Sequence, residues 1–239
     1  MISNFVEKYL WKLLRKADPA YHLVKTSWSQ CGEDLIVDFL LTWVLGIKCP
    51  SYLDIGAHHS HHFNNTYIFY KRGLTGVNIE PDPQLFNNLV KYRPFDINVN
   101  KGVGFKKNNE GADFYIMSSR ALNTFSKEEA ERVSKSGNVK IDKIIQVELI
   151  NINDVLSSYF SEKGLDYLTI DVEGYDLAIL KSLDFENHCP KVICVETASF
   201  TEELIVKQQG TIDFIISKGF VVYADTSINT IFVRKSLLA

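Results

Sequence analysis

Hydrophobic and polar positions along the chain follow two patterns, one typical of buried strands and one typical of amphipathic helices. Short β-rich runs predict strands at 51–55, 75–79, 96–100, 165–170 and 191–195, and most of these runs are almost continuously apolar, as strands buried on both faces should be. Apolar residues at helical spacing predict helices in most of the intervals, at 64–72, 82–92, 127–136, 153–161, 174–182 and 201–218. Such alternation is typical of a parallel sheet with helices on both faces.

Two segments modify this plan. Near the C-terminus, 219–225 and 229–235 have the pattern of two strands joined by a short turn, so we expect the sheet to finish with an antiparallel hairpin. Between the third and fourth main strands, 102–123 and 139–151 are each expected to add one small strand, the first of them at 113–117. No internal repeat or Pro/Ser-rich linker interrupts the chain, and 239 residues commonly form one α/β domain. We therefore predict a single domain over 27–239, preceded by an N-terminal amphipathic helical extension over 1–26.

The N-terminal extension has its own amphipathic pattern. Its apolar residues recur at helical spacing: Ile2, Phe5, Val6, Tyr9, Leu10, Leu13 and Leu14. Charged residues interrupt them, so the segment lacks the continuous apolar region of a signal peptide, and no stretch approaches the ~20 residues of a membrane span. We expect the stripe to dock on the protein's own core or on a sister subunit of a homo-oligomer. Docking of residues 1–24 on a membrane surface or on another partner is the alternative.

Composition narrows the range of partners and compartments. The chain has 26 basic and 29 acidic residues and a formal charge of −3, so it has no domain-wide basic field and we expect no nucleic acid partner. The four cysteines stand far apart in the sequence, without a CxxC pair. This spacing resembles neither a zinc site nor a disulfide framework, and it favours reduced thiols in the cytoplasm.

Carboxylates follow four of the five predicted parallel strands, at Asp54, Glu80, Asp171 and Glu196. In an open parallel sheet ligands bind beyond these strand ends. Gly56 stands alone there, without the G-x-G-x-x-G fingerprint of a dinucleotide site, and acidic strand ends disfavour a phosphate ligand. Glu80 follows Gly56 at the sequence spacing of an acidic residue that accepts hydrogen bonds from a ribose diol. The pattern suggests a phosphate-free nucleoside with a positive centre, a description that S-adenosylmethionine fits.

Four segments together resemble the FkbM-type S-adenosylmethionine-dependent methyltransferases. The two longest are "YLDIGAHHSHHFNNTYIFYKRGLTGVNIEPDPQLF" at 52–86 and "LTIDVEGYDLAILKSL" at 168–183. The segments 27–37 and 122–133 are also similar, so the resemblance extends from about residue 27 to about residue 200. It implies an α/β fold with the Rossmann-like, seven-stranded methyltransferase sheet, mostly parallel, with a C-terminal antiparallel hairpin and helices on both faces. Residues 27–239 would then be the methyltransferase domain.

The resemblance also implies which residues hold the cofactor. Asp54, Gly56 and His58 would face its methionine part, and Glu80 would hold the ribose, with Pro81 and Asp82 shaping the turn. Asn100, Gly102 and Val103 would lie near the adenine, and Gln30 and Glu33 would close the pocket from the N-terminal side. One departure concerns the cofactor loop, because this chain has His58 and Ser60 where methyltransferases commonly have further glycines.

The cluster His58, His59, His61 and His62 allows three interpretations. His58 and His62, four residues apart, could share a helical face and bind a metal ion, although no metal-binding motif accompanies them. One imidazole, with His59 as the candidate, could accept a proton from a substrate hydroxyl. The third interpretation is that the histidines hydrogen-bond the loop, the cofactor carboxylate or water.

Asp171, Glu173 and Glu196 are the other catalytic candidates. Methyl transfer to oxygen requires alignment of donor and acceptor and removal of one proton, which a strand-end carboxylate could accept. In some small-molecule O-methyltransferases of this fold, carboxylates at these strand ends bind magnesium, and Asp171 and Glu196 are similarly placed; magnesium is therefore left open as a second cofactor. Glu173 precedes Gly174 and could instead cap the next helix. Residues 118–126 could cover the acceptor pocket, or form an ordinary loop and a helix cap at Ser126.

These observations predict a cytoplasmic S-adenosylmethionine-dependent methyltransferase that O-methylates a sugar or a sugar-containing small molecule, as in polysaccharide biosynthesis. The acceptor rests on the resemblance alone. Two alternatives stay open: a catalytically silent cofactor-binding or scaffolding module of a glycan-assembly system, and a dinucleotide-dependent oxidoreductase on a related sheet.

Overall fold

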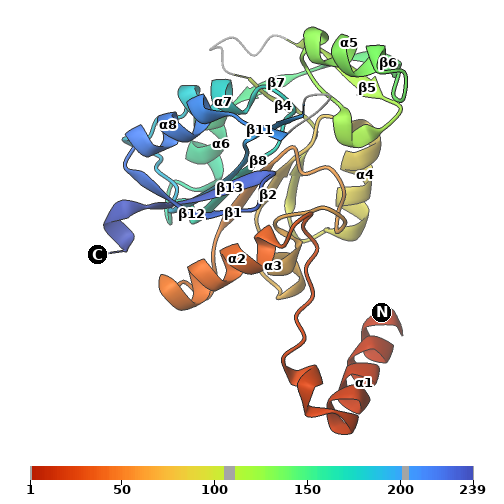
Figure 1. Cartoon of the computed structure of the whole chain (residues 1–239), viewed down its shortest axis with the longest axis vertical. Coiled ribbons are helices and arrows are strands. Elements are labelled where there is room, and N and C mark those ends of the chain that lie inside the picture. The colour runs from red at the N-terminus through yellow and green to blue at the C-terminus, as the bar shows by residue number, and fades with distance from the viewer. Residues whose placement is uncertain (1, 105–110, 201–204, 239) are drawn as a thin grey trace.

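A seven-stranded sheet lies at the centre of the molecule (Figure 1). The computed structural model describes residues 2–104, 111–200 and 205–238. The strand order across the sheet is β12-β13-β9-β8-β1-β2-β3. In chain order these strands are β1 (Tyr52–Ile55), β2 (Val77–Ile79), β3 (Ile97–Val99), β8 (Tyr167–Ile170), β9 (Val192–Glu196), β12 (Phe220–Asp225) and β13 (Asn229–Arg234).

The pairing of these strands confirms the predicted mixed sheet. β1 pairs in parallel with β2 and with β8, β2 pairs with β3, and β8 pairs with β9. β13 is antiparallel to both β9 and β12 and so forms the expected hairpin. The chain runs outward from β1 to β3 and then returns to β8 on the other side of β1. The strand order therefore reverses between β1 and β8, and this is where ligands bind in sheets of this kind.

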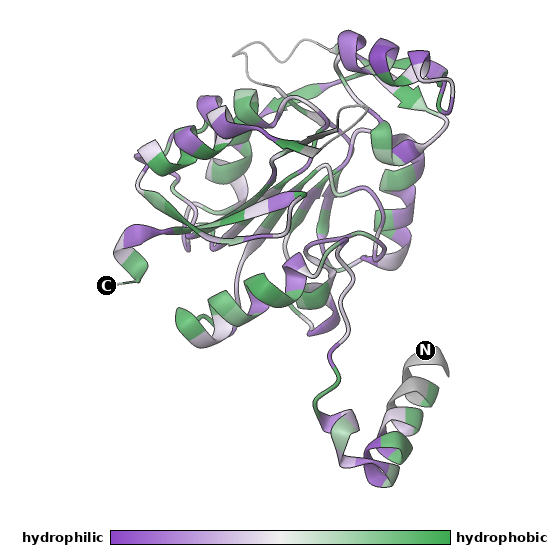
Figure 2. Cartoon of the chain, in the orientation of Figure 1, coloured by the Kyte–Doolittle hydropathy of each residue, from purple (hydrophilic) through white to green (hydrophobic). Residues whose placement is uncertain are grey.

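Helices cover both faces of the sheet, because successive residues of each strand point to opposite faces. On one face Leu53 and Leu168 pack against α6 (Ile152–Tyr159), α7 (Asp176–Ser182) and α8 (Gln209–Ser217). On the other face Tyr52 and Tyr167 pack against α2 (Glu33–Phe39), the π-helix η2 (Leu40–Val44) and α3 (Tyr67–Lys71). Figure 2 shows the apolar strands between these two helical layers.

An insertion between β3 and β8 covers the carboxyl-terminal edge of the sheet (Figure 1). It contains β5 (Ala112–Met117), which pairs with β6 (Ile141–Val147), and α5 (Lys127–Lys135), which packs on both strands. Segment 139–151, expected to hold one strand, holds two, because β7 (Leu149–Asn151) is separate and pairs in parallel with β4 (Gly102–Gly104). This second pairing joins segments far apart in the sequence, which local patterns do not reveal.

The predicted helix over 201–218 is wrong at 205–207. β10 (Ala198–Phe200) and β11 (Ile205–Lys207) form an antiparallel pair, and α8 begins only at Gln209. Residues 201–204 lie outside the described residues. A short apolar run such as Ile205–Lys207 has no periodicity of its own, and pairing with a neighbouring strand decides its conformation.

The N-terminal helix α1 (Ile2–Ala17) lies apart from the sheet and its helices, together with the 3-10 helix η1 (Pro19–His22) (Figure 1). Its apolar stripe does not dock on the protein's own core, contrary to our first expectation, because Tyr9, Leu10 and Leu13 remain exposed. The expectation of a sister subunit stays a prediction. Among the described residues, no helix combines the length and apolar character that crossing a bilayer requires.

Candidate functional site

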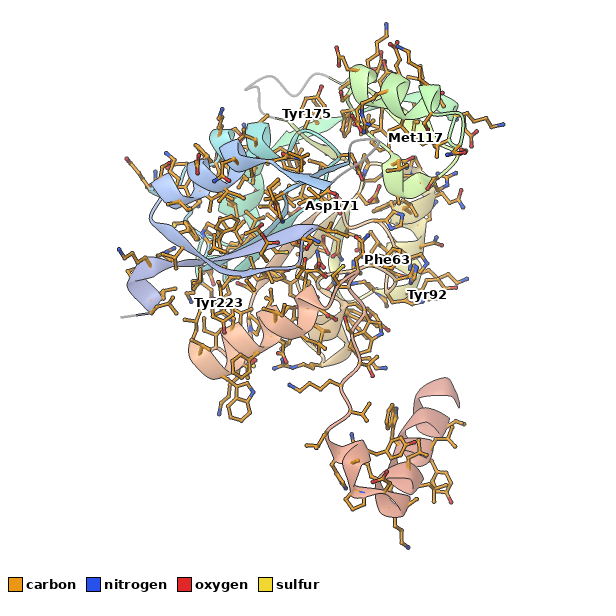
Figure 3. The ribbon with its side chains drawn as sticks, in the orientation of Figure 1. Phe63, Tyr92, Met117, Asp171, Tyr175 and Tyr223 are labelled. Carbon is orange, nitrogen blue, oxygen red and sulfur yellow. The ribbon has the colours of Figure 1, made fainter. Side chains whose placement is uncertain are left out.

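A cavity of about 310 Å³ opens at the carboxyl ends of β1 and β8, where the strand order reverses. Most of the residues predicted for the site line it: Gln30, Asp54, Gly56, His58, Glu80, Pro81, Gly102, Val103, Asp171, Glu173 and Glu196. In Figure 3, Asp171 lies between Tyr175 and Phe63, and both of these residues line the cavity. Four predicted residues do not line it, namely Glu33, His59, Asp82 and Asn100.

Gly56 brings the ends of β1 and β8 into contact. Its φ is +79°, which glycine adopts without strain, and a Cβ atom built at this position would lie 1.9 Å from the carbonyl oxygen of Asp171. The next loop residues include His58, whose φ of +49° is in the left-handed region. The backbone shape that glycine commonly provides in this loop is therefore adopted here by a histidine.

Asp54, at the end of β1, is held in place by residues of the loop that follows this strand. Its Oδ2 accepts hydrogen bonds from Thr66 Oγ1 at 2.7 Å and from Asn64 Nδ2 at 3.3 Å. Burial raises the pKa of Asp54, and the positive charge of Arg93 opposes that rise. Arg93 is fully buried and donates to Asn64 Oδ1 and Thr66 Oγ1, each at 3.0 Å. Sequence patterns did not indicate this arginine, because it lies far from the strand ends along the chain.

Glu80, at the end of β2, is buried and faces the same cavity. Its Oε1 accepts the backbone N–H of Asp82 at 2.8 Å, and its Oε2 accepts that of His58 at 2.7 Å. A carboxylate has about four acceptor positions, so two further hydrogen bonds can be made. Burial raises the pKa of Glu80 to about 8. A buried acid with unused acceptor capacity suits a ligand that presents two hydroxyl donors.

Asp82 and Asn100 shape the turn after β2 and do not reach the cavity. Asp82 caps α4 (Pro83–Tyr92) by accepting the N–H of Gln84 at 2.8 Å, and its other oxygen accepts bonds from Arg120 and Asn123. Asn100 donates to the carbonyls of Glu80 at 2.8 Å and of Pro81 at 3.1 Å. Their contribution to the site is indirect, since they fix the backbone on which Glu80 and Pro81 are carried.

Glu33 joins the N-terminal side of the domain to the terminal hairpin. It is fully buried and accepts hydrogen bonds from Thr226 Oγ1 at 2.7 Å and Asn229 Nδ2 at 3.0 Å. Burial raises the pKa of Glu33, but these hydrogen bonds outweigh it and leave the pKa below its ordinary value. Of the two residues expected to close the pocket from this side, Gln30 lines the cavity and Glu33 supports the fold behind it.

Asp171, Glu173 and Glu196 come together on the side of the cavity formed by β8 and β9. One carboxylate oxygen from each lies within 4.8 Å of the others. The pKa of Asp171 is raised to about 7, that of Glu196 to about 9 and that of Glu173 to about 10. Burial is the main cause in each case, and neighbouring carboxylates, among them Asp176, add to it. Glu173 has a φ of +50°, a backbone conformation that is costly for this residue type.

The histidine loop is not helical, so His58 and His62 do not share a helical face. His59 Nδ1 accepts the backbone N–H groups of His61 at 3.3 Å and His62 at 3.1 Å, which ties the loop together. Burial and the neighbouring histidines lower the pKa of His58 and His59, so both favour the neutral form. In the described part of the chain, the three carboxylates are the one group with metal-ligand spacing. His59 lines a shallow recess outside the main cavity.

The insertion forms the wall of the cavity opposite β1. Phe114, Leu122, Asn123 and Phe125 line it, and Ser126 caps α5 by accepting the N–H of Glu129 at 3.1 Å. The helix cap at Ser126 is thus confirmed, whereas cover of an acceptor pocket by residues 118–126 stays a prediction. Thr124 Oγ1 donates to the Glu173 carbonyl at 2.8 Å and so joins this wall to the carboxylate group.

Comparison with protein families gives one match that covers most of the chain. The family model described as "Methyltransferase FkbM domain" matches residues 54–222. This range contains Asp54, Glu80, Asp171, Glu173 and Glu196. No curated protein sequence matches the chain.

Solved structures with a similar arrangement include several methyltransferases. A TehB-like SAM-dependent methyltransferase from Corynebacterium glutamicum has 10% identity and a TM-score of 0.42, over 98% of this chain and 97% of that one. An O-methyltransferase from Bacillus cereus in complex with SAH has 13% identity and a TM-score of 0.36, over 93% and 88%. The 16S rRNA methylase ArmA has 10% identity and a TM-score of 0.35, over 93% and 96%. Likenesses of this size carry no inference about the acceptor.

Proposed function

Because this chain belongs to the FkbM family of S-adenosylmethionine-dependent methyltransferases, we propose that it methylates a hydroxyl of a sugar or of a sugar-containing small molecule. The observation that carries the proposal is the pairing of two acidic regions across one cavity. Asp54 and Glu80 lie on the β1–β2 side, and Asp171, Glu173 and Glu196 lie on the β8–β9 side. One region suits the cofactor and the other suits removal of a proton from the acceptor.

The residues of the β1–β2 side fit S-adenosylmethionine. Gly56 lines the cavity where the ends of β1 and β8 meet, and Glu80 offers the acceptor positions that a ribose diol requires. Pro81, Val103 and Phe125 supply apolar surface for an adenine. When bound, this cofactor supplies an electrophilic methyl group on a sulfonium centre. The neighbouring carboxylates lower the cost of burying that positive charge.

The carboxylates of the β8–β9 side act on the acceptor. Asp171 has the lowest pKa of the three, so it is the group that is first available as a base. It would accept the proton of the acceptor hydroxyl as that oxygen is methylated, and the carboxylate group would hold this proton until solvent removes it. Glu173 and Glu196 hold protons nearby and align the hydroxyl.

A second role proposed for the same three side chains is binding of a magnesium ion. Their oxygens are hard ligands, and their mutual distances of up to 4.8 Å suit a single cation. Asp171, Glu173 and Glu196 would hold the ion, which would lower the pKa of the acceptor hydroxyl. Activity measured with a chelator and again after addition of magnesium distinguishes a reaction that uses a carboxylate base alone from one that needs the metal ion.

We place the reaction in the cytoplasm, in the synthesis of a glycan or glycoside. The rival proposal is a catalytically silent module of a glycan-assembly system. A dinucleotide-dependent oxidoreductase is disfavoured, since a pyrophosphate would meet the carboxylates of Asp54 and Glu80. The formal charge of −3 supports an acceptor other than nucleic acid.

The test combines binding and turnover on the full chain. Titration calorimetry measures the affinity for S-adenosylhomocysteine, and transfer of a labelled methyl group to a panel of sugars measures turnover. We expect Asp171→Asn to lower turnover by roughly 100-fold, because a positioned base contributes about that much, and to leave cofactor affinity unchanged. Glu80→Ala should weaken cofactor binding by roughly tenfold, because it removes a buried acceptor pair.

Asp154→Asn, an exposed carboxylate on α6, is the matched control and should change neither quantity. Cofactor binding without methylation of any sugar would favour the silent module. Binding of a nicotinamide dinucleotide in place of S-adenosylhomocysteine would refute the proposal altogether.

A further inference from the structure

Helix α1 exposes a row of apolar side chains that no described part of the molecule covers. Val6, Tyr9, Leu10, Leu13 and Leu14 have exposed fractions between 38% and 57%. Their spacing of three and four residues places them on one side of the helix. Figure 2 shows both hydrophobic and hydrophilic residues along α1, away from the rest of the molecule. Globular proteins rarely leave such a side without a partner.

The opposite side of α1 is basic. At 100° per residue, Arg15 and Lys12 lie on the side away from the centre of the apolar row and Lys16 lies at the edge of the row beside Tyr9; all three are exposed. Residues 2–17 contain four basic residues and one acidic residue, a charge of +3, whereas the whole chain has −3. The remainder of the chain therefore has −6, so α1 carries a charge opposite to that of the body.

The segment after α1 keeps the helix at a distance from the body. Trp11 contacts the ring of Tyr21 edge to face, with centroids 6.3 Å apart, so η1 folds back on α1. Asp18 caps η1 by accepting the N–H of Ala20 at 2.8 Å. Leu23 and Val24 follow with exposed fractions of 82% and 48% and extend the apolar surface toward the linker.

We propose that α1 docks on an anionic lipid surface, with its apolar row at the boundary of headgroups and acyl chains. Helices that lie in this boundary have a strongly amphipathic pattern, little net hydrophobicity and a basic polar side. Helix α1 has all three features. Lys12, Arg15 and Lys16 would contact lipid phosphates. A second copy of the chain fits less well, because α1 has four basic residues and one acidic residue, so pairing through the apolar rows would bring together two helices of charge +3.

The test is co-sedimentation of the full chain with vesicles. We expect binding to vesicles that contain phosphatidylglycerol, with affinity at least roughly tenfold above that for pure phosphatidylcholine, and release at high salt. The double variant L10Q/L13Q should lose binding to both kinds of vesicle. The triple variant K12Q/R15Q/K16Q should lose the preference for vesicles that contain anionic lipid.

The matched control is V90Q/I216Q, which changes two apolar side chains of similar exposure, 46% and 45%, on helices of the body. It should bind vesicles as the unchanged protein does. Thermal melting of all variants checks that they are folded. Equal sedimentation of L10Q/L13Q and the control, or no sedimentation of the unchanged protein, would overturn the proposal. So would a dimer in light scattering that L10Q/L13Q converts to a monomer, since a second copy would then cover the row.

Discussion

At the scale of single residues, the chemistry of the site depends on where protons reside among Asp171, Glu173 and Glu196. Three carboxylates so close together cannot all be ionised at neutral pH without strong repulsion. Their protons are lost in steps that belong to the group as a whole, beginning near pH 7, to which the pKa of Asp171 is raised. Below that pH the group has no free base; above it, one carboxylate becomes available.

Methyl transfer should therefore gain rate as the pH rises through about 7. The raised pKa of Asp171 keeps the base protonated in acid, so turnover is lost as the pH falls below that value. Turnover with saturating cofactor and acceptor, measured across this range, checks the expectation. Asp171→Asn should remove the rise and Asp154→Asn should leave it in place. A profile that is level for the unchanged protein would contradict the role assigned to Asp171.

At the scale of elements, Arg93 connects the end of α4 to the loop after β1. Its guanidinium lies 2.6 Å from Asp96, and neither side chain of this ion pair is exposed. Through Asn64 and Thr66 it also reaches the carboxylate of Asp54. The arginine thus links Asp96, just before β3, to the loop after β1, and it does not itself line the cavity.

Replacement of Arg93 by methionine should destabilise the fold by about 3–5 kcal/mol, because Asp96 would remain as a buried charge without its partner. Arg72→Met is the matched control. Arg72 pairs with Asp38 in a partly exposed position, and its loss should cost less than about 1 kcal/mol. Urea unfolding measures both changes, and S-adenosylhomocysteine affinity should fall for Arg93→Met alone. Similar losses for the two arginines would refute this assignment.

Local pattern predicted β1, β2, β8 and β9 because each is a short run that is buried almost throughout. It failed where pairing with a distant segment decides the conformation, as for β4 with β7, and where a short run lacked any period, as for β11. In the site, the strand-end residues were found because a parallel sheet brings carboxyl ends to one edge. Arg93 was not found, because burial and pairing with Asp96 depend on the folded packing.

At the scale of the whole molecule, the chain divides into an acidic α/β body and a basic helix outside it. The described hydrogen bonds of residues 2–24 stay within that segment, for example from the Asp18 N–H to the Leu14 carbonyl and from the Leu23 N–H to the Ala20 carbonyl. The body instead begins its own network at Ser27, whose hydroxyl donates to Asp34 at 2.6 Å.

A variant that begins at Lys25 should therefore melt at the temperature of the full chain and bind S-adenosylhomocysteine equally well. Glu33→Gln in the full chain provides the contrast. It weakens the hydrogen bonds between α2 and the terminal hairpin and should cost roughly 1–3 kcal/mol. Calorimetric melting of the three proteins compares them. A clear loss of stability on removal of residues 1–24 would show that the extension belongs to the body.

The sequence by itself determined the order of the main-sheet strands and of most helices between them, the acidic strand ends and the amphipathic character of residues 2–14, since these depend on neighbouring residues and on a fixed period. Tertiary structure alone decided which acids meet, because Asp171 and Glu196 approach each other only after β8 and β9 pair. It also decided that Glu33 and Asp82 support the fold instead of lining the cavity, and that α1 stays outside the core. These outcomes depend on contacts between distant segments, and no local pattern contains them.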